Sequence, residues 1–280
     1  MRTKKFLASI ALLMSLLLPA LQGWSEKSCA KDLCVETVQE GTTVAFTVNN
    51  LQAADATVTF KVELTNMVAS EPMPYTLTVQ GKSTRKAFTL SIDDDAKAWR
   101  YQYWFHWITG SKDAKHDDES VYALPYHSGA AFKVIQAFHG TYSHFGEQEY
   151  AIDWEMPEGT AILAARAGVV VGVKEDEERG GASETYRDYA NYVRVRHSDG
   201  TIGEYAHLRK DGATVNVGDA VAAGDQLGFS GNTGFSSTPH LHFWVFKAVD
   251  GYTRASFPIR FKTREGWPIR LKQGRKYTAK

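Results

Sequence analysis

The chain has 280 residues, and its 32 Lys and Arg balance its 32 Asp and Glu, so the formal net charge is zero at neutral pH. A balanced charge provides no basic field that would recruit nucleic acid. This length is sufficient for one large domain or two ordinary ones, each with its own core. We therefore expect two domains and no nucleic-acid partner.

Residues 1–25 have the pattern of a secretory signal peptide. A short basic segment precedes the apolar stretch Phe6–Leu18, and small residues follow it. The apolar stretch is shorter than the ~20 residues that a membrane span requires. We expect cleavage near Ala20 or Ser25, a periplasmic or secreted mature protein, and no membrane span in the mature chain.

Cys29 and Cys34 are the only cysteines. In an exported protein an even number of cysteines favours a disulfide over free thiols. No neighbouring His or Cys completes a set of four zinc ligands around this pair. The pair is therefore expected to form a local disulfide near the mature N-terminus.

Between residues 26 and 130, short runs of alternating apolar residues are separated by turns. In Val58–Leu64 the apolar side chains occupy every second position, the pattern of a half-buried antiparallel strand. The regular spacing of these runs predicts an Ig-like β-sandwich. The aromatic run in residues 99–107 could form a sugar-stacking platform, but alternating aromatics favour a place in the core.

Residues 131–280 are also rich in strand patterns, and no convincing helix of three turns occurs in the mature chain. Residues 121–126 are expected to be the last strand of the sandwich, which places the domain boundary near residue 130. The charged segment Lys174–Tyr189 lies between two predicted strands. Long loops are usually functional or mobile, so we expect this one to form a wall of a substrate groove or to be a solvated surface loop.

Two histidines stand at the head of the apolar run near residue 240. In a strand, His240 and His242 point to the same face, which suggests a metal or acid/base site. A lone His-x-His is more often structural, so further ligands are needed. The chain offers His144 and Asp153 upstream, and His207 at the end of a strand pattern between them.

Together these segments resemble the lysostaphin/LytM-type zinc metallopeptidases, over about residues 134–249. That family has an early His and Asp, a middle Tyr-Ala-His-Leu stretch and a late His-x-His. All three parts occur here in the same order, as His144 with Asp153, Tyr205-Ala206-His207-Leu208 and His240-Leu241-His242. The resemblance implies an all-β protein in which the sandwich is followed by a LytM-type antiparallel β-sheet peptidase domain with a C-terminal tail, residues 131–280.

The resemblance also assigns the site residues. His144, Asp153 and His242 are the expected zinc ligands, and His207 and His240 are the expected catalytic groups beside the open coordination position. One of these two would accept a proton from the attacking water, and the other would stabilise the oxyanion. The sequence does not distinguish between them.

His139 is a competing early histidine. The family pattern places the ligand directly after Ser143 and before a Tyr-Ala-Ile-Asp run, which selects His144. The distance from this histidine to Asp153 is longer than the His-x-x-x-Asp spacing of lysostaphin, and it matches the longer form of some proteobacterial members.

The resemblance implies an exported zinc metalloendopeptidase that hydrolyses peptide bonds in peptidoglycan through attack of a zinc-activated water. Stem-peptide crosslinks are the expected substrate, in preference to polyglycine bridges or general proteins. One alternative is a catalytically silent LytM-type regulator of a partner cell-wall amidase, and another is a wall-binding adhesin. Silent modules have typically lost ligands, whereas all five residues are present here, which favours the enzyme.

Overall fold

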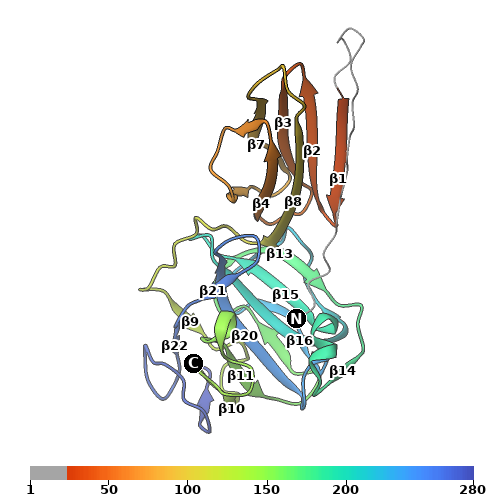
Figure 1. Ribbon diagram of the computed structural model, residues 1–280. Helices are drawn as coiled ribbons and strands as arrows, with labels where there is room; N and C mark the ends of the chain where they lie inside the picture. Colours follow the sequence, from red (N-terminus) through yellow and green to blue (C-terminus); the bar gives the residue numbers. More distant parts are fainter. Residues whose placement is uncertain (1–23) are drawn as a thin grey trace. The chain divides into compact units, whose positions relative to one another are not determined.

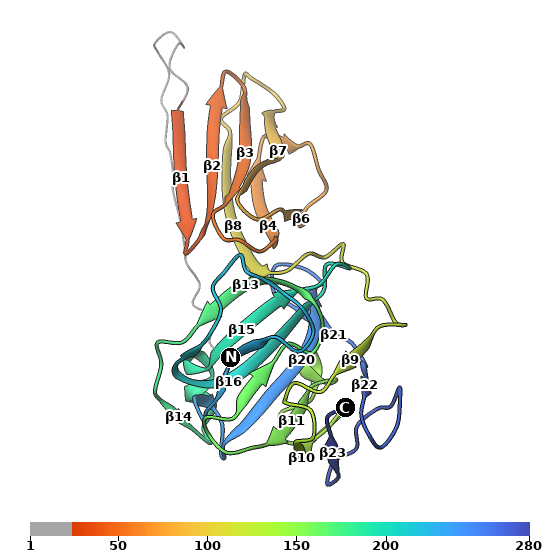
Figure 2. The ribbon, with the colours of Figure 1, turned by 180° about the vertical axis from the view of Figure 1, so that it is seen from behind.

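The computed structural model describes residues 24–280. The expected signal peptide lies outside the described residues except for Trp24 and Ser25, which begin strand β1. Regular structure in the described chain is almost entirely β-strand (Figures 1 and 2), and the 3-10 turns η1 (Gly146–Gln148) and η2 (Glu184–Tyr189) are its helical segments. The all-β prediction is therefore confirmed. Within residues 24–280, no helix is long and apolar enough to cross a membrane.

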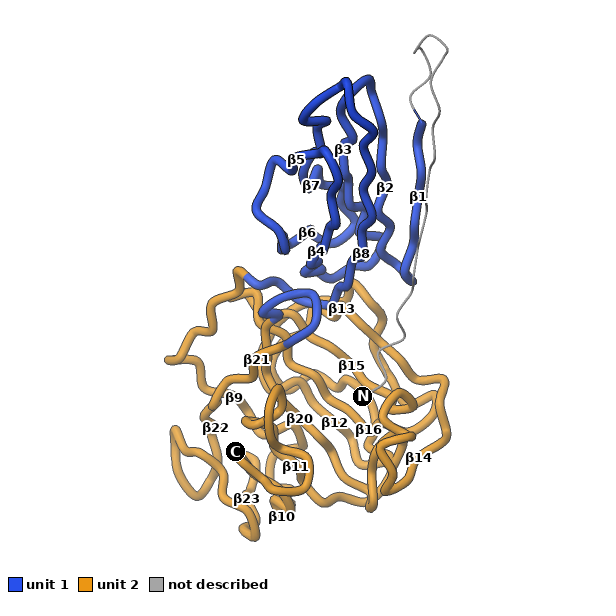
Figure 3. The backbone as a smooth tube through the Cα atoms, viewed as in Figure 1, with its two compact units in different colours: residues 1–112, 248–253 blue, residues 113–247, 254–280 orange. Residues whose placement is uncertain are grey.

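The chain divides into two compact units (Figure 3). Unit 1 contains the chain up to Lys112 together with residues 248–253, and unit 2 contains residues 113–247 and 254–280. Unit 1 has two antiparallel sheets. Its five-stranded sheet has the order β1 (Trp24–Ala30), β2 (Leu33–Glu40), β3 (Thr43–Asn50), β7 (Ser83–Ile92) and β5 (Met67–Ala69). Its three-stranded sheet has the order β6 (Tyr75–Val79), β4 (Ala56–Thr65) and β8 (Arg100–Thr109).

The two sheets of unit 1 share one hydrophobic core, as a β-sandwich requires. Phe46 of β3 stacks on Phe88 of β7 with ring centroids 4.4 Å apart, and it meets Phe60 of β4 edge to face at 6.3 Å. The aromatic run of β8 contributes to this core, because Tyr103 is buried and lies edge to face with Phe46 at 5.1 Å. The expected disulfide is also present: Cys29 and Cys34 are opposite each other in the β1–β2 hairpin.

Unit 2 is built on one large antiparallel sheet. Its main path has the order β17 (Ala220–Val221), β13 (Gly168–Lys174), β15 (Asn191–Arg196), β16 (Ile202–Ala213), β20 (His240–Ala248), β11 (Ile152–Glu155), β10 (Ala131–Gln136) and β23 (Lys276–Thr278). Strands β12 (Ala161–Leu163), β18 (Gln226–Ser230) and β21 (Arg254–Ser256) join this sheet off the main path. Two further pairs are parallel: β14 (Gly180–Gly181) with β19 (Gly234–Phe235), and β9 (Val121–Ala123) with β22 (Arg260–Lys262).

Strand β9 corrects one expectation. The segment that contains it was expected to be the last strand of the sandwich, but β9 pairs with β22 in unit 2. The cause is Tyr122, whose side chain is fully buried with ring centroids 6.4 Å from both Phe243 and Phe261. A distant C-terminal segment therefore provides the partner of this strand.

The two faces of the unit 2 sheet differ in polarity. Along β20, Leu241, Phe243 and Val245 enter the hydrophobic core, which also contains Trp154 and Tyr205. Because strand side chains alternate, the residues between them point to the opposite face. On β20 that face carries His240 and His242, followed by Trp244 and Phe246, whose rings stack 4.3 Å apart. We call it the polar face because it positions the histidines discussed next.

Candidate metal centre

Strand register brings the histidines and the aspartate together. In the antiparallel β11–β20 pair, Asp153 is opposite His242. In the β16–β20 pair, Ala206 is opposite His242, and His207 is the next residue of β16. His144 comes from the connection between β10 and β11. Segments that are distant in sequence therefore converge at neighbouring strands.

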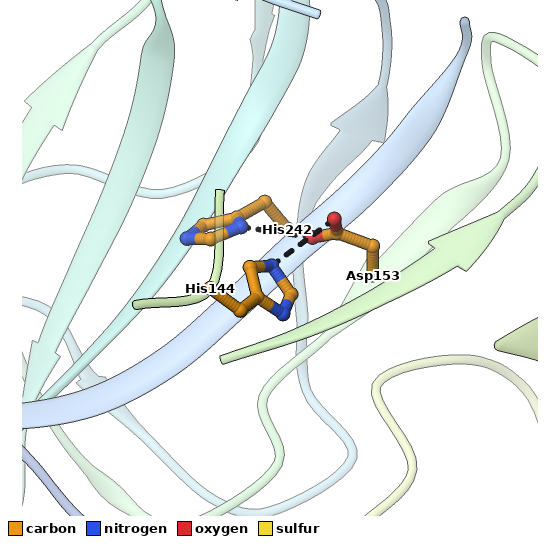
Figure 4. A group of neighbouring side chains, drawn as sticks. All are labelled: His144, Asp153 and His242. Carbon is orange, nitrogen blue, oxygen red and sulfur yellow. Dashed lines mark hydrogen bonds and ion pairs between the residues drawn. The ribbon is translucent and has the colours of Figure 1, made fainter. Parts of the chain in front are cut away.

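His144, Asp153 and His242 form a compact group around the carboxylate (Figure 4). Asp153 Oδ2 lies 3.1 Å from His144 Nε2, and Asp153 Oδ1 lies 2.8 Å from His242 Nδ1. One candidate ligand atom from each residue lies within 4.8 Å of the others. All three residues are at least 95% buried. This spacing is suitable for three ligands that share one metal ion.

The hydrogen bonds around His144 test whether this group fits a metal. Its Nδ1 lies 3.0 Å from the Ala137 carbonyl and donates to it, which leaves Nε2 as the unprotonated nitrogen. That Nε2 is buried without a hydrogen-bond partner, and it faces an oxygen of Asp153. Two acceptors that face each other repel unless a cation lies between them. Two imidazoles and one carboxylate are a donor set typical of zinc and similar divalent ions, so the residues fit a metal ion.

The carboxylate of Asp153 is ionised at neutral pH. Burial opposes its ionisation, but the interaction with His242 outweighs burial and holds the pKa of Asp153 well below its usual range. The group therefore offers a negative charge to a cation over the whole physiological pH range.

His207 and His240 lie beside this group with their rings 4.5 Å apart. Each donates its Nδ1–H to a backbone carbonyl: His207 to Thr233 O at 2.6 Å, and His240 to Thr238 O at 2.7 Å. Both therefore present Nε2 as an acceptor, and that of His240 is 3.8 Å from Asp153 Oδ1. Of the five expected site residues, His144, Asp153 and His242 form the compact group, and His207 and His240 lie outside it.

Both imidazoles are neutral at neutral pH. Burial, together with His240 and His242, lowers the pKa of His207 to about 3, and burial lowers the pKa of His240. His207 also has an unusual backbone, because its φ of 65° lies in the left-handed region. The neighbouring ladder is irregular, with a register shift after Leu208.

His139, the competing early histidine, is outside the site. Its side chain is 65% exposed, and its Nδ1 lies 4.0 Å from a carboxylate oxygen of Glu149. The structure therefore brings together the five residues that the family pattern selects and leaves this one at the surface.

Sequence reasoning missed Gln136, which supports the aspartate. Its amide nitrogen donates to Asp153 Oδ2 at 3.0 Å and to Ser143 Oγ at 2.8 Å, while its oxygen accepts the N–H groups of Tyr142 and Ser143 at 3.1 Å. A Cβ at Gly140 would lie only 2.3 Å from the Gln136 side chain, so a glycine is needed there. No motif marks this glutamine, and only its position opposite Asp153 in the β10–β11 ladder indicates the role.

Sequence reasoning also missed Gln148. It lies in η1, inside the long connection between His144 and Asp153, and its amide nitrogen is 3.3 Å from His242 Nε2. The longer spacing therefore supplies a side chain that contacts an expected ligand on its far side.

The charged segment Lys174–Tyr189 contains β14 and η2, and β14 pairs with β19. The residue before β19 is Thr233, whose carbonyl accepts the hydrogen bond from His207. The segment is thus connected to the site through one strand pairing.

The family model of Peptidase family M23 matches residues 147–253. An uncharacterized metalloprotease from Buchnera aphidicola is 38% identical over 116 residues, which are 41% of this chain and 26% of that protein. The peptidoglycan DD-endopeptidase ShyA from Vibrio cholerae is 35% identical over 91 residues, which are 32% of this chain and 18% of that protein.

Lysostaphin from Staphylococcus simulans is 36% identical over 123 residues, which are 44% of this chain and 23% of that protein. The solved structure of its catalytic domain is 26% identical, covers 47% of this chain and 88% of that chain, and gives a TM-score of 0.31. The matched region thus spans about a quarter or less of the length of these three relatives. Residues 147–253 of this chain thus form a Peptidase family M23 domain with lysostaphin among its relatives.

Proposed function

We propose that this protein is an exported zinc metalloendopeptidase that hydrolyses peptide crosslinks of peptidoglycan. In this proposal His144, Asp153 and His242 hold the zinc ion, and His207 and His240 are the catalytic groups. The observation that carries the proposal is the buried His144 Nε2, which has no hydrogen-bond partner and faces a carboxylate oxygen at 3.1 Å. Folding alone does not explain such a pair of facing acceptors.

A zinc ion at this place would lower the pKa of a water molecule enough for it to attack a peptide carbonyl at neutral pH. The chain's own residues handle the protons. His207 Nε2 and His240 Nε2 are both acceptors in the neutral state, because each Nδ1–H is held by a backbone carbonyl. One of them would take a proton from the water and pass it to the leaving amine. The other would donate to the developing oxyanion as the tautomer that carries its proton on Nε2 in place of Nδ1.

The proposed substrate and location depend on the relatives and the sequence. Similarity to a peptidoglycan DD-endopeptidase supports stem-peptide crosslinks as the substrate, although lysostaphin is also similar. The signal-peptide pattern and the Cys29–Cys34 disulfide support a periplasmic or secreted protein. The silent regulator of a cell-wall amidase is disfavoured, since all five site residues are present and lie together.

The test combines metal content with digestion. We expect purified protein to contain one equivalent of zinc, to cleave crosslinked muropeptide dimers, and to leave pentaglycine intact. The matched control is His242→Ala, which lacks one ligand. Zinc-loaded protein that cleaves neither substrate would support the regulatory role, and cleavage of pentaglycine alone would contradict the choice of substrate.

A further inference from the structure

A depression of about 390 Å³ in unit 2 is lined by residues of β10, β11 and β23, and by Thr238 and Pro239, which directly precede His240. Its lining includes Glu155 of β11, which is opposite His240 in the ladder. Glu155 is two residues along the strand from Asp153, so the two side chains share a face and their Cα atoms are ~7 Å apart. Two residues of the lining, Glu155 and Pro239, are therefore close along the chain to the site residues Asp153 and His240.

Two lysines extend this row across the sheet. Lys133 of β10 is opposite Glu155, and Lys276 of β23 is opposite Lys133. Cross-strand partners lie on the same face with Cβ atoms ~5 Å apart. The row therefore runs from His240 through Glu155 and Lys133 to Lys276, and these last three residues all line the depression.

The positive charges of Lys133 and Lys276 are available to bind an anion. Both are exposed, and within residues 24–280 neither side chain has an ion pair or a hydrogen bond. Like charges directly opposite each other in a sheet are unfavourable, so folding gives no reason for this pair. Glu155 is the one acidic residue of the lining, which leaves an excess of one positive charge.

Both lysines also lie outside residues 147–253, the part matched by the family model. Lys133 belongs to the strand before that region, and Lys276 belongs to the last strand of the chain. The two lysines therefore come from outside the matched region, whereas Glu155 lies within it.

We propose that this depression is a carboxylate pocket, which binds a free carboxylate of the substrate next to the scissile bond. Lys133 and Lys276 donate to that carboxylate, and Glu155 accepts an amide or ammonium N–H of the same residue. The inference rests on the proposed function, because a crosslink from D-alanine to a diamino acid leaves a free carboxylate beside the bond to be cut. Polyglycine bridges carry no such group.

The experiment compares two matched crosslinked dimers, one with this carboxylate free and one with it amidated. We expect the zinc-loaded protein to prefer the free acid, mainly through a lower KM. In the proposed complex each lysine forms an exposed ion pair with the substrate carboxylate, so Lys133→Gln and Lys276→Gln should each lower kcat/KM for the acid by up to about fivefold. Neither change should affect the amide. Lys262→Gln, which removes an exposed charge on β22, is the control and should leave the preference unchanged.

A second measurement is independent of catalysis. N-acetyl-D-alanyl-D-alanine and its C-terminal amide are titrated into the metal-free protein, followed by NMR. We expect saturable shifts at the carboxylate pocket with the acid and none with the amide, and their loss in the Lys133→Gln, Lys276→Gln double variant. Equal binding and equal cleavage of acid and amide would overturn the pocket while leaving the peptidase proposal intact. No cleavage of either dimer, with acid-selective binding retained, would count against the peptidase alone.

Discussion

Two buried carboxylates on the polar face of the same sheet have different partners. Glu204 accepts from Arg194 Nε at 2.5 Å and from Trp244 Nε1 at 2.9 Å, and the pKa of Glu204 is lowered to about 2 because these partners outweigh its burial. Asp153 is similarly buried, yet the side chains closest to its oxygens include the imidazoles of His144 and His242. The charge of Glu204 is balanced by an arginine, whereas Asp153 has no arginine or lysine partner within residues 24–280.

The difference separates a structural ion pair from a candidate metal ligand. Arg194 carries its charge at any pH, so the Glu204 pair is complete within the chain. Around Asp153, His144 donates its Nδ1–H to the Ala137 carbonyl, so the Nε2 that faces the carboxylate has no proton to donate. Both carboxylates are buried, but the hydrogen-bond and charge partners of Glu204 all lie within the chain, whereas Asp153 faces a His144 nitrogen that cannot donate to it.

Removal of a ligand should have the largest effect on activity. His242→Ala leaves two ligands, which is too few for a tight site, so zinc and activity should be lost together. His207→Ala should retain zinc, measured by metal analysis, and lose activity by about a hundredfold or more because it removes only proton handling. Stoichiometric loss of zinc from His207→Ala would show that the roles of the histidines are assigned wrongly.

Removal of Glu204 should instead affect folding. Glu204→Ala leaves the Arg194 charge buried without its partner, so the free energy of unfolding should fall by about 3–5 kcal/mol in a urea titration. Zinc content should not change. The double variant Glu204→Leu, Arg194→Met is the control and should recover most of the loss; if Glu204→Ala lost zinc but not stability, the contrast between the two carboxylates would fail.

A buried histidine on the core face, His197, should make the stability of the protein depend on pH without affecting the candidate metal site. His197 is 98% buried, donates its Nδ1–H to the Ala167 carbonyl, and has no partner at Nε2. Burial lowers the pKa of His197 to about 4, below the ~6.5 of an unfolded chain. The unfolded state therefore binds more protons between these two values, and stability is lost as pH falls through them.

Between pH 7 and pH 5 this histidine should reduce the free energy of unfolding by about 2 kcal/mol. Urea titrations at both pH values measure the change, and His197→Gln should remove that share of it. The exposed His127 provides the control, since His127→Gln should leave the pH dependence as it is. A pH dependence that is the same in His197→Gln and in the unchanged protein would exclude this residue as the cause.

The smallest expected effect concerns the support of Asp153. Gln136→Ala removes the hydrogen bond that holds the carboxylate, and loss of such a partner typically weakens metal binding by about tenfold or somewhat more. Competition with a zinc chelator measures the affinity. Ser143→Ala removes another contact of the same glutamine and should change affinity much less. Equal losses of zinc affinity in the two variants would show that the hydrogen bond from Gln136 to Asp153 does not support metal binding.

The sequence predicts the site better than it predicts the surroundings of the site. Alternation along β20 places His240 and His242 on one face, and the family pattern selects His144 in preference to His139. The supporting residues Gln136 and Gln148 are not predicted, because their roles depend on strand register and on the path of a loop. The strand that contains Tyr122 is also misplaced, since its partner β22 lies more than a hundred residues further along the chain.

The left-handed backbone of His207 has a consequence for how this protein tolerates change. At that φ a glycine is the residue that the backbone alone would select, and a residue with Cβ costs roughly 1 kcal/mol more. The His207→Gly variant should therefore have a higher melting temperature than the His207→Ala variant, although both lack the imidazole. A histidine at this position therefore costs stability, and the proposed proton-transfer role of its imidazole gives a reason for that cost.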